Sequence, residues 1–139
     1  MLMNWKLIFS LSLFGLAMAF ATITLVPSPV EPLLWVAIFV FCAYTIAKRA
    51  PGKFFLHGFF VGLVNCIWIT SAHIIFSTTY LQHHAQEAAQ YSKMNAQMGM
   101  SPMVAMAVFG PLIGIASGLV IGLFSWIASK LLKSRESPL

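Results

Sequence analysis

Charged residues are scarce in this sequence. Only 8% of the 139 residues are charged and only three are acidic, whereas soluble domains carry about 25% charged residues. Because 60% of the residues are hydrophobic, a water-soluble fold of this size could not bury its apolar surface. The composition therefore excludes a soluble globular domain and a nucleic-acid-binding protein, and it indicates that lipid surrounds most of the chain.

Catalytic motifs are also missing. The sequence contains no nucleotide-binding loop, no HExxH or GxSxG motif and no paired catalytic carboxylates. Its two cysteines, Cys42 and Cys66, lie in the middle of apolar runs, so we expect buried free thiols rather than a disulfide framework. We therefore expect a protein that is not an enzyme, and we predict no cofactor.

Long apolar runs dominate what is present. Four of them are long enough to cross a bilayer as helices, and they predict an all-α integral membrane protein, a four-helix bundle forming one membrane domain over residues 1–139. The expected helices cover about 5–26, 32–47, 54–98 with a break near residue 81, and 102–132.

The first apolar run also has features of a signal peptide. Lys6 precedes it, and the small residues from Ala17 to Ala19 resemble a cleavage site. The run nevertheless continues to Val26, so we expect an uncleaved membrane helix.

Basic residues indicate the orientation. Seven of the eight fall before the first run, between the second and third, or after the fourth: Lys6, Lys48, Arg49, Lys53, Lys130, Lys133 and Arg135. Because positive residues stay on the cytoplasmic side, we expect both termini in the cytoplasm and the protein in the bacterial inner membrane. Residues 82–98 are rich in Ala and Gln, which favours a helix. We therefore expect helices three and four to extend into an extracytoplasmic hairpin, which is either a docking site or a connector.

Glycine recurs every fourth residue in the last run, at Gly110, Gly114, Gly118 and Gly122. Such glycines lie one above another on a helix and allow a second helix to approach closely. The pattern predicts a glycine zipper, and Gly58, Gly62 and Ser117 are further packing candidates. Three roles fit this face: packing within the chain, contact with another chain, or a pore lining.

Two polar side chains fall within the third run. Asn65 lies near its middle, where an unpaired amide is costly, so we expect it to face the other helices and bond to one of them, for example through a serine of the fourth run. His73 is expected to form a hydrogen bond near the membrane interface. Both residues also fit a solute path. A haem site is disfavoured because His57 and His73 fall on opposite faces of one helix.

The polar stretch after the third run contains candidate metal ligands: His83, His84, Glu87, Met94 and Met98. Histidine and glutamate at helical spacing can bind zinc, and methionine thioethers favour copper. The alternative interpretation is a water-exposed helix end with methionines that fill a helix contact. On a continued helix one stripe contains four residues, namely His73, Tyr80, His84 and Glu87.

The second half of the chain carries two stretches with a family resemblance, "KRAPGKFFLHGFFVGL" and "MGMSPMVAMAVFGPLIGIASGLVIGLFSWIASKLLK". It resembles a family of small four-helix bacterial membrane proteins of unknown function, of Bacteroidetes type, which share a glycine-rich last helix ending in lysines. The match covers residues 53–133 best, although the external segment is shorter and less charged here. The resemblance implies a fold and a membrane location and no catalytic residue.

We therefore expect a small accessory or scaffolding subunit that associates through its glycine-rich faces and the hairpin, within a homo-oligomer or a larger membrane complex. The alternative is a transporter or channel component for a small solute or a metal such as copper, using Asn65, His73 and the His/Met segment. A third hypothesis is an electron-transfer subunit.

Overall fold

The computed structural model describes residues 2–136, and within them it has six helices and no strand. Their bounds are α1 Trp5–Thr24, α2 Glu31–Arg49, α3 Phe54–Ile75, α4 Ser77–His83, α5 Ala85–Met98 and α6 Pro102–Glu136. Four are long and apolar enough to cross a membrane, namely α1, α2, α3 and most of α6. The expected all-helical class with four candidate membrane spans is confirmed.

Local sequence features explain several helix ends. The Asn4 side chain accepts a hydrogen bond from the backbone N–H of Leu7 at 3.1 Å and thereby caps α1. Pro32 lies in the first turn of α2, where its missing N–H costs nothing. Gly99 ends α5 with a φ of 65°, a left-handed conformation that glycine adopts without a steric penalty.

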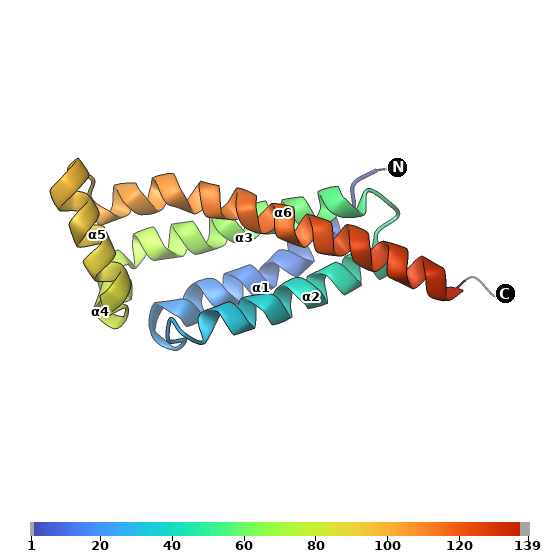
Figure 1. The fold of residues 1–139 in the computed structure, drawn as a ribbon, viewed down its shortest axis with the longest axis horizontal. Helices are drawn as coiled ribbons and strands as arrows, with labels where there is room; N and C mark the ends of the chain where they lie inside the picture. Colours follow the sequence, from blue (N-terminus) through green and yellow to red (C-terminus); the bar gives the residue numbers. More distant parts are fainter. Residues whose placement is uncertain (1, 137–139) are drawn as a thin grey trace.

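The four long helices do not pack equally. Helix α3 packs mainly against α6 and α1, and α6 also packs against α2. Helix α2 meets α1 and α3 over short stretches only. The start of α1, the α2–α3 loop and the end of α6 lie at one end of the molecule, and α4 and α5 lie at the other (Figure 1). We call the two parts the terminal half and the distal half.

The terminal half contains the larger hydrophobic core. Its buried residues come from all four long helices: Leu7, Ile8, Leu11, Cys42, Ile46, Val61 and Ile121. His57 is also fully buried there, and both its ring nitrogens are engaged, one by the backbone N–H of Asn4 at 3.0 Å and the other by the carbonyl of Lys53 at 3.0 Å. His57 is therefore a satisfied core histidine far along α3 from His73.

The third helix differs from the expected one. It ends at Ile75 and is followed by breaks at Phe76 and His84, not by one break near residue 81. Helices α4 and α5 turn across the distal end and do not extend the axis of α3 (Figure 1), so the expected hairpin of two extended helices takes another form. The break at His84 has a tertiary cause, because the side chain of this residue is buried against α1 and the α1–α2 loop.

Candidate functional site

A cavity of about 600 Å³ lies in the distal half. Residues of α2, α3 and α6 form its sides, and Tyr80 of α4 and Tyr91 of α5 contribute to its distal end. Ligand pockets in proteins have volumes of roughly 300–1,000 Å³, so the cavity is large enough for a small organic molecule. It exists because α2 packs against α6 but barely contacts α3.

The glycine series of α6 lies against α3 of the same chain. In the terminal half the two backbones touch: a methyl group at Gly58 would lie 2.6 Å from the α6 backbone, and one at Gly122 would lie 2.8 Å from the carbonyl oxygen of Phe55. Gly62 and Gly118 face each other directly. A Cβ atom at these positions would force the helices apart. Of the three roles considered for this face, packing within the chain is the one that the structure describes.

Farther along, the same face meets side chains instead of backbone. Gly110 lies against the side chain of Thr70, and Gly114 lies against Cys66. The Cys66 thiol donates a hydrogen bond to the carbonyl of Gly110 at 3.0 Å. Gly110, Gly114 and Ser117 also line the cavity. The wider spacing between α3 and α6 at this level therefore leaves room for side chains and for the cavity.

Asn65 lines the cavity near the middle of α3. Its side chain is only 3% exposed, yet neither amide atom has a hydrogen-bond partner among the described residues. The expected bond to another helix is therefore not formed. The buried α6 serines instead bond to their own helix, Ser125 to the carbonyl of Ile121 and Ser129 to that of Trp126. A buried amide without a partner is costly.

Three aromatic rings are stacked where α3, α4 and α5 meet. The rings of His73 and Tyr80 lie 4.2 Å apart, and those of Tyr80 and His84 lie 4.3 Å apart. Sequence spacing placed these residues in one stripe, and the structure brings them together although the helix is broken. His73 Nε2 also lies 3.0 Å from the hydroxyl of Thr22.

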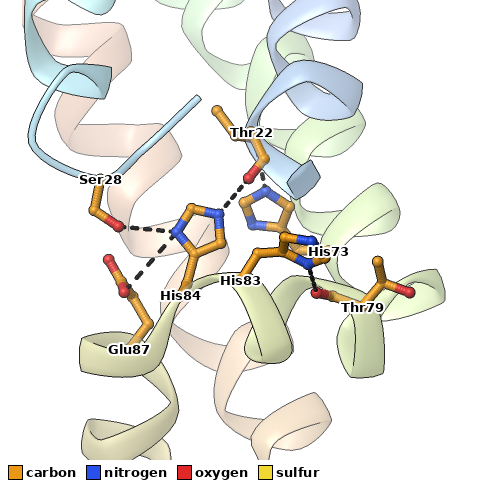
Figure 2. A network of polar contacts seen from close by, with 7 residues as sticks. All are labelled: Thr22, Ser28, His73, Thr79, His83, His84 and Glu87. Carbon is orange, nitrogen blue, oxygen red and sulfur yellow. Dashed lines mark hydrogen bonds and ion pairs between the residues drawn. The ribbon is translucent and has the colours of Figure 1, made fainter. Parts of the chain in front are cut away.

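His84 is held by two partners from other elements (Figure 2). Its Nε2 lies 2.5 Å from the carbonyl oxygen of Thr22, and its Nδ1 lies 2.8 Å from the hydroxyl of Ser28. A carbonyl only accepts, so Nε2 is the protonated nitrogen, and in the neutral ring Nδ1 accepts from Ser28. Glu87 Oε2 lies 4.0 Å from this Nδ1. This carboxylate oxygen is buried and has no hydrogen-bond partner among the described residues.

A second carboxylate belongs to the same cavity. Glu31, in the first turn of α2, accepts a hydrogen bond from the indole N–H of Trp35 at 3.2 Å, and both residues line the cavity. Burial raises the pKa of Tyr80, and the negative charges of Glu87 and Glu31 raise it further. Burial and then the charge of Glu87 raise the pKa of Tyr91. The two phenols therefore remain protonated beside the carboxylates.

Sequence reasoning missed Glu31, Trp35 and Tyr91. A signal for Glu31 was present: it is one of only three acidic residues, and it begins an apolar helix. Nothing in the sequence indicated that the start of α2 would lie close to α5, because that contact depends on the turn of α4 and α5 across the distal end.

The candidate metal ligands are not assembled. His83 is exposed, and its Nδ1 lies 2.9 Å from the carbonyl of Thr79, away from Glu87 (Figure 2). Met94 is half-buried and Met98 is exposed on α5. Within residues 2–136, no three His, Cys, Asp or Glu side chains form a group that could hold a metal ion. Zinc, copper and haem stay predictions without geometric support here.

No family model, curated protein or solved structure matches the chain. The resemblance to small four-helix membrane proteins stays a prediction.

Proposed function

We propose that the protein binds a small solute in the distal cavity and acts as a component of a small-solute membrane transporter. The observation that carries this proposal is Asn65, whose buried and unpartnered amide lines a cavity of about 600 Å³. An amide inside a membrane helix is retained when it has a partner, and a bound solute would supply one. The absence of a catalytic set in the sequence supports a binding role over an enzymatic one.

The geometry gives less support to the accessory-subunit hypothesis. That hypothesis depended on a glycine face available to a partner, and this face lies against α3 of the same chain. The distal connector is also less available, because α4 contacts α1 and α5 contacts α6. A homo-oligomer or a larger complex would have to use the lipid-facing surfaces.

We further propose that both termini are cytoplasmic and that the protein lies in a bacterial inner membrane. The grouping of the helix ends supports this orientation, because the start of α1, the α2–α3 loop and the end of α6 share one end of the molecule (Figure 1). Seven of the eight basic residues belong to those three segments. In this orientation the cavity lies toward the outer side of the membrane.

Binding of a neutral fluorescent probe tests the proposed function. N-phenyl-1-naphthylamine becomes fluorescent in apolar sites, and we expect one saturable site per chain in nanodiscs. Ser117→Phe should abolish that site because Ser117 lines the cavity. The matched control is Ala116→Phe, since the neighbouring Ala116 is exposed.

Circular dichroism and thermal unfolding must show that both variants fold. Absence of saturable binding to the native chain would contradict the proposal, and so would equal binding by the two folded variants.

A further inference from the structure

The distal cavity combines negative charge with aromatic surface. Two of the three acidic residues of the chain, Glu31 and Glu87, line it. The aromatic residues that line it are Trp35, Phe39, Tyr80, Tyr91 and Phe109. Carboxylates attract a cation directly, and the faces of aromatic rings attract it through their quadrupoles. These two kinds of group are gathered in one cavity although acidic residues are rare in this chain.

The carboxylate of Glu87 lacks a cationic partner. Its buried Oε2 has no hydrogen bond among the described residues. The nearest histidine nitrogen, Nδ1 of His84, lies 4.0 Å away and is engaged by Ser28 at 2.8 Å. No lysine or arginine lines the cavity within the described part of the chain. A buried charge needs a partner, and the protein itself supplies none at this oxygen.

The other end of the cavity has a different character. Ile69, Ile113 and the small residues Gly110 and Gly114 form apolar walls there, and Asn65 adds its unpartnered amide. A ligand that fills the cavity would therefore carry a charged end beside the carboxylates and an apolar body that reaches toward α3. Asn65 is a second and independent sign of a ligand, because it is 3% exposed and does not belong to the acidic cluster.

We propose that the solute is an organic cation, an amine or quaternary ammonium with an apolar or aromatic body, held by Glu31, Glu87 and the surrounding aromatic rings. This inference rests on the proposed function and names the class of solute. An anion would be repelled by the two carboxylates. A metal ion requires several converging ligands, which are not gathered among residues 2–136, and it would leave the apolar walls without contact.

A pair of isosteric ligands tests the charge requirement. Phenyltrimethylammonium and tert-butylbenzene have nearly the same shape, but only the first is charged. We expect calorimetric titration of the native chain to show that the cation binds at least about tenfold more tightly than its neutral isostere. Benzenesulfonate should not bind. Equal affinity for the cation and the neutral compound would overturn the inference.

Two variants identify the group responsible. Glu87→Gln should weaken phenyltrimethylammonium binding about tenfold and leave N-phenyl-1-naphthylamine binding unchanged. The control is the double variant Glu87→Gln with Gln86→Glu, which restores the net charge on the exposed face of α5. If the double variant regains affinity, general surface charge attracts the cation, and the inference fails.

The neutral probe separates the two levels of the proposal. Normal binding of N-phenyl-1-naphthylamine without cation preference would overturn the solute class and leave the proposed function standing. Loss of binding for both ligands in the native chain would remove both. Competition by phosphatidylcholine, but not by phosphatidylglycerol, would identify a lipid headgroup as the source of the ammonium. Absence of competition by either lipid would assign the site to a free solute.

Discussion

The terminal and distal halves of the molecule use the same helices in different ways. In the terminal half α3 and α6 touch backbone to backbone, and residues from four helices fill the core. In the distal half the same two helices are separated by side chains, and a cavity of about 600 Å³ opens beside them. The comparison teaches that one glycine series can support close packing at one level and a binding cavity at another.

The halves also differ in how their polar groups are satisfied. His57 in the terminal half has partners for both ring nitrogens. In the distal half Asn65 and one oxygen of Glu87 have none within residues 2–136. Because unpartnered buried polar groups destabilise a fold, the terminal half should provide most of the stability, and the distal half should provide the site.

Leucine substitutions at two glycines should break this comparison with the largest effect. Gly58→Leu places a side chain against the α6 backbone, and we expect it to lower the free energy of unfolding by about 3 kcal/mol or more. Gly110→Leu meets the Thr70 side chain beside the cavity, and its cost should be smaller because that side chain can move. Unfolding in detergent measures both.

Ala116→Leu is the control for these substitutions, because Ala116 lies on the exposed face of α6 and should change stability little. If Gly58→Leu abolished an oligomer while the monomer stayed equally stable, the contact between α3 and α6 of one chain would not be the stabilising one.

Asn65→Leu should give an effect of intermediate size and opposite sign. Removing an unpartnered amide from the interior should raise the stability of the empty protein by about 1–2 kcal/mol and reduce probe binding. Asn95→Leu, on the exposed side of α5, is the matched control. A loss of stability on replacing Asn65 would mean that its amide has a protein partner, contrary to the structure.

The smallest expected effect concerns the phenols of the distal half. In a Tyr44→Phe background only Tyr80 and Tyr91 titrate, and both should form phenolate above the usual pKa of 10.0. Because the folded-state pKa values are raised, their contribution to stability is complete below about pH 10 and is lost as the pH rises further.

Ultraviolet absorbance of the phenolate measures this titration. Glu87→Gln should lower both pKa values by removing a negative charge, while burial continues to raise them. Titration at unchanged pH in the Glu87→Gln variant would show that this carboxylate does not face the phenols.

Sequence reasoning predicted the helical class and four candidate spans because apolar runs of this length have few other solutions in lipid. The stripe from His73 to Glu87 was predicted from spacing alone and does meet in space. The cavity was not predictable, since it depends on how far α2 lies from α3. The site residues Glu31 and Trp35 were missed for the same reason, because their role depends on a contact between α2 and α5 rather than on local sequence.

The pairing of α3 with α6 has a consequence for biosynthesis. Helix α3 is synthesised before α4, α5 and α6, and chains grow at about 5–20 residues per second. For several seconds α3 is therefore in the membrane without its main partner, with its glycine face and Asn65 covered only by α1, lipid or the insertion machinery. Assembly of the cavity is complete only after α6 has entered, so a ribosome that stops in α5 would release a chain with neither the close contact nor the site.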